Sequence, residues 1–161
     1  MRILDGILYS VFYDDIQDGT LVIPDEVTKI GKRVFWKKEN LKSIIIPESV
    51  SFIDDFAFSE CINLESIIIS KGLRFIGAYA FNECEKIEFI NLPNSVTLLG
   101  NCVFRRCENL KSIIFSSEIK HITSDLCEDC VSLTDVTVSK DCEIDYDAFN
   151  GCRNLQHIHE I

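Results

Sequence analysis

Residues 41–69 read LKSIIIPESVSFIDDFAFSECINLESIII, and within this stretch the same pattern begins twice. It begins at Leu41 and again at Leu64, and each leucine opens a run of alternating apolar positions. The period of about 23 residues lies within the range of stacked repeat architectures, and it continues along the chain. The leucine column reads Leu41, Leu64, Ile87, Leu110, Leu133 and, after a slightly shorter unit, Leu155.

Other columns keep the same register, and they include residues that are rare in this chain. The prolines fall in one column: Pro24, Pro47 and Pro93. An aromatic column contains Phe35, Phe58, Phe81, Phe104, Cys127 and Phe149. Five of the eight cysteines form another column: Cys61, Cys84, Cys107, Cys130 and Cys152. The 161-residue chain therefore consists almost entirely of about six copies of one unit.

Each unit contains a signal for one strand and one tight segment. The I-x-I alternation has the period of a strand, and proline ends it because proline cannot donate to a ladder. The segment 54–61 opens with Asp54 as an N-cap, and its apolar residues Ala57, Phe58 and Cys61 suit a single helical turn. One unit cannot bury its own apolar edge, but stacked units form a continuous core. The sequence therefore predicts an α/β repeat protein, β-rich overall. Its seven strand positions would form a parallel concave sheet, with short helical turns and extended segments on the convex side.

The repeat resembles the BspA-like leucine-rich repeat family over about residues 20 to 158. The segments that carry the resemblance are SIIIPESVSFIDDFAFSECINL and FINLPNSVTLLGNCVFRRCENL, against a family pattern of roughly LxxIxIPxxVxxIGxxAFxxCxxL. The resemblance implies a leucine-rich repeat solenoid. It also implies a protein-binding role, often in adhesion or host interaction, at the cell surface or in secreted form.

Both ends of the chain depart from the repeat. Residues 1–19 contain the turn signals Asp5-Gly6 and Asp18-Gly19 and are predicted to form an N-terminal β cap. Residues 20–161 are predicted to form the solenoid, and no capping pattern follows its last unit. Because an unpaired strand edge tends to pair with another chain, we expect self-association as a homodimer through this end. The residues predicted at that edge are Val138, Phe149 and Ile158.

Charge and hydropathy exclude several classes of partner. The formal net charge is −10, and the basic residues occur only as pairs, which disfavours nucleic acid. No apolar run reaches the roughly 18 residues of a membrane span. No secretory signal opens the chain, so a complete chain would be cytoplasmic, whereas the family resemblance implies the cell surface.

The cysteine column predicts buried thiols rather than chemistry. Cysteines one repeat apart occupy equivalent places on successive coils, and parallel side chains fit disulfide geometry poorly. Cys127 and Cys130 form a C-x-x-C pair, the spacing of redox and zinc sites, but both fall in apolar columns. Cys102 lies in a column of mixed polarity and is expected to be partly exposed.

No motif for catalysis, a cofactor or a metal stands out. His157 and His159 alternate on the last predicted strand, so both would face outward, but no third ligand lies near them in sequence. Gly-rich phosphate loops, G-x-S-x-G and H-E-x-x-H are missing. The sequence therefore predicts a non-enzymatic protein with no cofactor and no metal site.

The outward strand positions are the candidate binding site for a protein or peptide. By strand alternation, the residue between the two core isoleucines points away from the core. The residues predicted to bind are Val22, Ile45, Ile68, Phe89, Asn91 and Ile114. Strand propensity alone explains Val and Ile in such positions, but not the large Phe89. Two alternatives remain: a structural spacer within a longer surface protein, and a thiol redox enzyme at Cys127 and Cys130.

Overall fold

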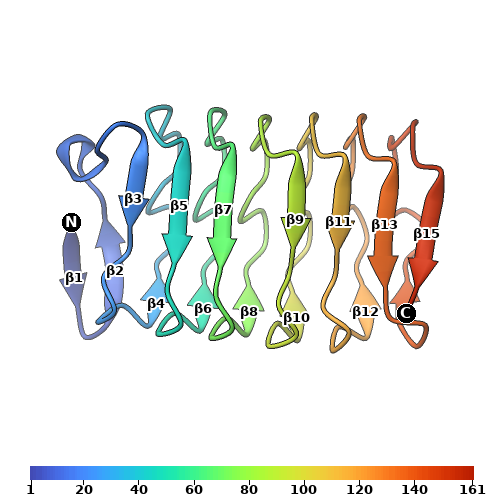
Figure 1. Ribbon diagram of the computed structural model, residues 1–161, viewed down its shortest axis with the longest axis horizontal. Helices are drawn as coiled ribbons and strands as arrows, with labels where there is room; N and C mark the ends of the chain where they lie inside the picture. The colour runs from blue at the N-terminus through green and yellow to red at the C-terminus, as the bar shows by residue number, and fades with distance from the viewer.

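The computed structural model describes residues 1–161 as a stack of coils in which each complete coil contributes one longer and one two-residue strand (Figure 1). The longer strands are β3 Thr20–Val22, β5 Ser43–Ile46, β7 Ser66–Ile69, β9 Phe89–Asn91, β11 Ser112–Ile114, β13 Asp135–Val138 and β15 His157–Glu160. The short strands are β4 Lys29–Ile30, β6 Phe52–Ile53, β8 Phe75–Ile76, β10 Leu98–Leu99, β12 His121–Ile122 and β14 Glu143–Ile144. Pairing between successive coils is parallel and in the register of the sequence repeat.

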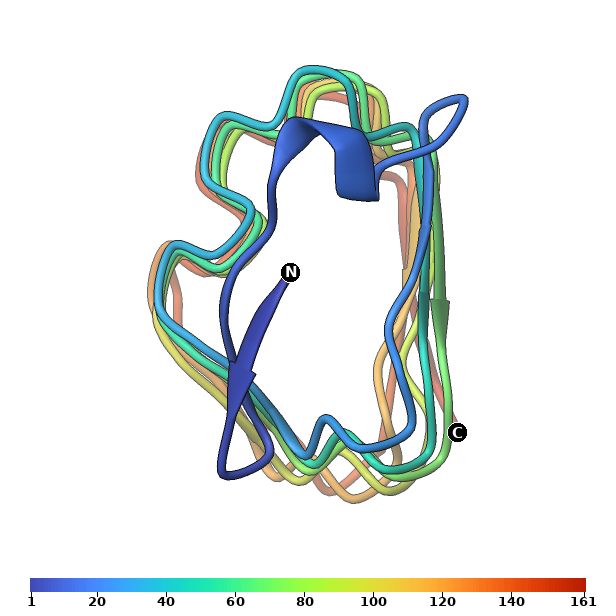
Figure 2. The same cartoon turned by 90° about the vertical axis from the view of Figure 1, so that its left-hand side faces the viewer.

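An antiparallel hairpin begins the stack. Strands β1 (Arg2–Leu4) and β2 (Ile7–Ser10) pair with each other, and β2 then pairs in parallel with β4. Viewed down the long axis, β1 runs from the N-terminus, inside the outline of the coils, to one side of that outline (Figure 2). A 3₁₀ turn, η1 (Tyr13–Asp15), follows the hairpin, and Leu8, Val11 and Ile16 are buried in the core.

The predicted helical turns are wrong. Residues 54–61 form consecutive tight turns, and η1 is the only helical element of the chain. Ala57, Ser59 and Cys61 donate their amides to carbonyls three residues earlier, whereas the intervening amides of Phe56, Phe58 and Glu60 donate to the next coil. Phe56 and Glu60 have φ of 57° and 60°, and a left-handed residue at every fourth position prevents a helix from continuing.

The core follows the predicted columns. A single cluster of 43 buried residues runs through the stack. Phe35, Phe58, Phe81 and Phe104 are fully buried and stack on one another, with ring centroids 4.6, 5.0 and 5.8 Å apart. Because each of these coils contributes one ring, each phenylalanine packs against the equivalent phenylalanine of the next coil. This stacking explains why an aromatic residue recurs at the same position of the repeat.

The parallel sheet of longer strands is interrupted, although the sequence predicted a continuous one. It consists of β3-β5-β7 and β9-β11-β13-β15, and β7 is not hydrogen-bonded to β9. Ile67 and Ile69 of β7 are partly exposed, whereas Ile44 and Ile46 at the equivalent positions of β5 are fully buried. On the other side of the coils β8 still pairs with β10, and the row of short strands is interrupted one coil later, between β10 and β12. The third and fourth coils are thus joined through their short strands and open along their longer ones.

The stack is close to straight, because successive coils nearly superpose when viewed down the long axis (Figure 2). The outward side of the longer strands, which we call the sheet face, is therefore broad and nearly flat over these coils rather than deeply concave. The structure contains no helix with the length and apolar character needed to span a bilayer.

Candidate functional site

The sheet face presents the residues that the sequence predicted to point outward. Val22, Ile68, Phe89 and Ile114 have exposed fractions of 60, 54, 64 and 40%. Asn91 is exposed and Ile45 is half-buried. Strand alternation produces this result, because the neighbouring residues Ile44 and Ile90 point inward and are buried. At the outward positions, large apolar side chains thus lie in water on four of the seven longer strands.

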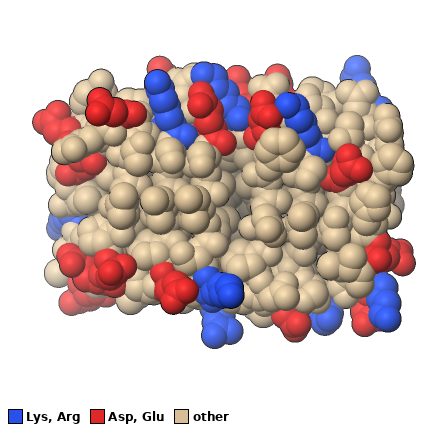
Figure 3. Space-filling view, viewed as in Figure 1, with Lys and Arg blue, Asp and Glu red and all other residues tan.

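Charged side chains border this face rather than cover it. Figure 3 shows lysine, arginine, aspartate and glutamate gathered along the two edges, with a band of uncharged residues between them. Lys111 Nζ lies 2.7 Å from Glu88 Oε2 and 5.8 Å from the centroid of the Phe89 ring. Lys86 Nζ lies 3.5 Å from Glu65 Oε1. The border therefore carries both signs of charge in pairs, and the band between is apolar and polar but uncharged.

The three surface pockets, or hollows, lie away from the sheet face. One, of about 500 Å³, is lined by polar side chains near η1, including Tyr13, Lys38 and Asn63. The other two are lined by residues of the β2–β4 region and of the last turns. No residue of the predicted binding set lines any of them. Small molecules bind in concave pockets, so a flat apolar face suits a macromolecule better.

The residues predicted at the self-association edge are not equivalent. β15 is the outermost strand of its sheet and is paired with β13 alone. Ile158 on β15 is 45% exposed although it occupies a core column, and Phe149 is partly buried against the core. Val138 is 1% exposed, because β15 pairs with β13 and the last coil covers the Val138 side chain. Val138 is therefore wrong as an edge residue.

Six of the eight thiols are buried, and the cysteines of the repeat column form a ladder with a structural role. Each cysteine of the column donates from Sγ to a backbone carbonyl one coil earlier, as Cys84 does to Phe58 O at 3.2 Å and Cys107 to Phe81 O at 3.2 Å. Burial raises the pKa of Cys61 to about 12 and the pKa of Cys84 and Cys107 well above the usual value. All eight cysteines are free.

The C-x-x-C pair lies in the same environment. Cys127 and Cys130 are fully buried. Burial raises the pKa of Cys127, and the hydrogen bond with Cys127 raises the pKa of Cys130. A reactive thiol needs exposure and a lowered pKa, so the geometry is the opposite of a redox site. Cys102, expected to be partly exposed, is 6% exposed, because its side chain packs within the turns.

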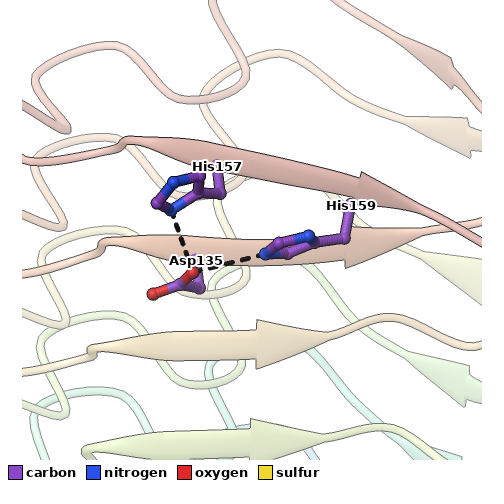
Figure 4. Close-up of side chains that lie close together, drawn as sticks. All are labelled: Asp135, His157 and His159. Carbon is purple, nitrogen blue, oxygen red and sulfur yellow. Dashed lines mark hydrogen bonds and ion pairs between the residues drawn. The ribbon is translucent and has the colours of Figure 1, made fainter.

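One cluster of potential metal ligands was not predicted from the sequence. His157 and His159 do point to the same side of β15, and Asp135 on β13 lies against both rings (Figure 4). Asp135 Oδ1 is 3.3 Å from His157 Nδ1 and 3.3 Å from His159 Nε2. Its polar neighbours Thr134 and His159 lower the pKa of Asp135. The signal was present in the sequence, because Asp135 precedes His157 in the same outward column, but the two residues are neighbours only across coils.

Comparison with known proteins gives one family and several similar folds. The family model of the BspA type leucine-rich repeat region matches residues 6–87 and 28–156, with six copies of the repeat. A leucine-rich repeat protein of T. pallidum is 28% identical, with a TM-score of 0.81 over 89% of this chain and 70% of that one. No curated protein matches this chain.

Two further solved structures show the fold alone. The pneumococcal vaccine antigen PcpA is 22% identical, with a TM-score of 0.84 over 94% of this chain and 38% of that one. A leucine-rich repeat protein from Eubacterium ventriosum is 24% identical, with a TM-score of 0.71 over 88% of this chain and 48% of that one. This chain thus spans less than half the length of these two proteins.

Proposed function

Because this chain belongs to the BspA-type leucine-rich repeat family, we propose that it is a non-enzymatic protein-binding module whose ligand lies across the sheet face. Leucine-rich repeat solenoids offer an extended surface built from equivalent strand positions, and binding is the common use of such surfaces. The ligand in this proposal is a protein or a peptide. The flat shape of the face and the absence of its residues from the three hollows support a macromolecule.

The observation that carries the proposal is the exposure of Ile68 and Phe89 on adjacent coils, at 54 and 64%. Burying apolar surface contributes about 25 cal/mol per Å². A ligand that covered these two side chains would therefore gain affinity without any rearrangement of the core. Exposed apolar groups rimmed by polar ones are typical of interaction surfaces. Asn91 would supply a polar anchor between the apolar contacts, and Val22, Ile45 and Ile114 would extend the contact along the stack.

The charged side chains at the edges of the sheet face would affect which ligands bind more than how tightly they bind. The edges of the face carry paired lysines and glutamates, such as Lys111 with Glu88 and Lys86 with Glu65. Exposed pairs of this kind contribute little to stability, but rim charges steer encounters and reject wrongly charged partners. With a net charge of −10, the chain favours ligands that are neutral or basic overall.

The setting that we propose is adhesion or host interaction at a bacterial surface, which the family resemblance supports. The alternative is a spacer, in which the coils set distance within a longer protein and the sheet face binds nothing. The two roles require different things of Ile68 and Phe89. A binding site needs these exposed apolar side chains for contact with a ligand, whereas a spacer needs only residues that are compatible with a strand.

The experiment compares capture of partners by three forms of the chain. The Ile68→Asp, Phe89→Ser double variant removes the centre of the proposed site. The control is Leu98→Asp, which places a charge at another side chain that is 59% exposed, on the short strand β10. Thermal unfolding should show that all three forms are folded, because none of the changed side chains is in the core.

Wild type and Leu98→Asp should capture the same proteins from an extract, and the double variant should lose them. If the double variant retains every partner of the wild type, the sheet face is not the binding site and the spacer role is favoured. Loss of the same partners from both variants would also contradict the proposal, because it would point to a general effect of added charge.

A further inference from the structure

Three donor atoms meet on the sheet face at the junction of β13 and β15. Asp135 is opposite His157 in the register of the two strands, and His159 is two residues further along β15. One ring nitrogen of His157, one of His159 and a carboxylate oxygen of Asp135 all lie within 4.8 Å of one another. Figure 4 shows both rings turned toward the carboxylate from the neighbouring strand. The cluster uses strands that the core holds in place, so its donors are positioned by the fold.

Two of the three donor separations match those of a tetrahedral metal centre. Ligands of zinc lie about 2.0–2.1 Å from the ion, and two ligands at a tetrahedral angle are therefore separated by about 3.3 Å. Both nitrogen-to-carboxylate separations are 3.3 Å. The two rings lie nearly parallel, with centroids 5.6 Å apart and an angle of 21° between their planes, and their donor nitrogens lie within 4.8 Å of each other. Coordination of one ion would require the two rings to turn so that these nitrogens approach.

The donor set fits a divalent transition metal better than calcium or magnesium. Imidazole nitrogen is a preferred ligand of zinc, copper and nickel, whereas calcium and magnesium require oxygen ligands. Two histidines and one carboxylate leave a fourth position open, as in zinc sites that keep water or an external ligand. The three side chains are 44 to 57% exposed, so an ion can reach them without any local unfolding.

The rest of the chain offers a comparison site that lacks the third donor. His121 Nε2 lies 2.9 Å from Asp145 Oδ1 on the other side of the coils. That pair contains a histidine and a carboxylate with similar exposure, but no second histidine. Six of the eight thiols are enclosed in the core, and the two partly exposed ones, Cys142 and Cys152, belong to no group of three donors.

We propose that Asp135, His157 and His159 bind one divalent transition metal ion, with zinc as the ion that the geometry fits. In this site His157 coordinates through Nδ1, His159 through Nε2 and Asp135 through one carboxylate oxygen. The open position faces solvent on the sheet face. The site is separate from the apolar set around Ile68 and Phe89, and it does not depend on the proposed protein ligand.

The test titrates zinc chloride into the folded 161-residue chain and follows the three imidazole rings by nitrogen-detected NMR. The signals of His157 Nδ1 and His159 Nε2 should shift together and saturate at one zinc per chain, while those of His121 stay in place. Calorimetry under the same conditions should give the same stoichiometry. Cobalt(II), used as a substitute, should give the absorption of a tetrahedral ion.

Variants separate the site from incidental surface binding. His157→Gln, His159→Gln and Asp135→Asn should each weaken zinc binding by at least the roughly tenfold typical when a supporting partner of a metal site is lost. His121→Gln is the matched control and should bind zinc like the wild type. Equal shifts of all three histidines, or no loss in the three variants, would mean that Asp135, His157 and His159 form surface ion pairs only.

Discussion

Phenylalanine serves two roles in this chain, and position within the repeat decides which. Phe81 belongs to the aromatic column and is fully buried between Phe58 and Phe104. Phe89 lies on the strand that follows, on the sheet face, and is 64% exposed. Both positions could be predicted from the register alone, because the column fixes the direction of the side chain before any contact is known.

The first prediction contrasts these two residues. Phe81→Ala should reduce the free energy of unfolding by about 3–5 kcal/mol, because it leaves a cavity in a core that cannot collapse around it. Phe89→Ala should change it by less than about 0.5 kcal/mol, as exposed positions do. Urea unfolding of both variants measures the difference. Similar losses from the two substitutions would contradict the assignment of the columns.

The second prediction follows from the raised pKa of the buried thiols. An unfolded thiol ionises near pH 9, but Cys61 in the folded chain has a pKa of about 12. Above pH 9 the unfolded state releases a proton that the folded state keeps, so stability is complete below that pH and falls as the pH rises toward 12. Each such thiol contributes a loss of about 1.4 kcal/mol per pH unit.

Urea unfolding between pH 8 and 10.5 should therefore show a stability that decreases with pH in the wild type. Cys61→Ala should be less stable at pH 8, because it loses packing, but its stability should decrease less steeply. The slope of the unfolding free energy against pH is the diagnostic quantity, because it reports the protons released on unfolding and not the packing that the variant loses. Identical slopes in the two proteins would contradict the burial of a neutral thiol at this position.

At the scale of elements, the strands were predictable and the turns were not. The I-x-I alternation and the proline column identify the longer strands, because a period of two is typical of a strand and not of a helix. The segment 54–61 has apolar spacing that fits a helical turn equally well. Its backbone is decided by the neighbouring coil, which accepts the amides of Phe56, Phe58 and Glu60. A pattern within one unit carries no information on hydrogen bonds between units.

The missing hydrogen bonds between β7 and β9 could not be predicted from the repeat pattern either. Gly72, in the turn that follows β7, lies close to this interruption in sequence. A Cβ at Gly72 would lie 1.7 Å from the carbonyl oxygen of Glu48, so the second and third coils approach too closely there for any side chain. The neighbouring units have Ser49 and Ser95 in the same column. The third coil therefore lies tight against the second and open toward the fourth.

The third prediction concerns this close approach. Gly72→Ala should destabilise the chain by about 1–3 kcal/mol, because the backbone of one coil must move away from the other. Ser95→Ala is the control, since that position already accommodates a Cβ, and it should be nearly neutral. Thermal unfolding of the two variants compares them. A neutral Gly72→Ala would show that the coils are not in contact at this point.

At the scale of the whole molecule, the sequence predicted the solenoid but only part of its surfaces. The apolar residues of the sheet face were found because they break the expectation of polar side chains on an outward column. Asp135 was missed because it lies one repeat before His157 in sequence, and only strand register brings the two together. Clusters built from different coils become visible only when the columns are compared with one another.

The fourth prediction is self-association through β15, which has a strand neighbour on one side only. Ile158 occupies a core column but is 45% exposed, so pairing with a second chain would bury it. Light scattering over a concentration series should show dimers of the 161-residue chain. Ile158→Lys should abolish them, whereas Tyr146→Lys, at a fully exposed turn position, should not. A wild type that stays monomeric at high concentration would contradict this prediction.

The interruption of the sheet also makes the molecule mechanically uneven. Along most of the stack, tension parallel to the long axis is shared by hydrogen bonds of the longer strands, the tight turns and the short strands. Between the third and fourth coils the longer strands contribute none, so the turns and the β8–β10 pair carry the load. Under tension these two coils would bend apart about the short strands and open the sheet face between Ile68 and Phe89. A ligand that spans both side chains would resist this opening, so the stack would be stiffer when it is occupied than when it is free.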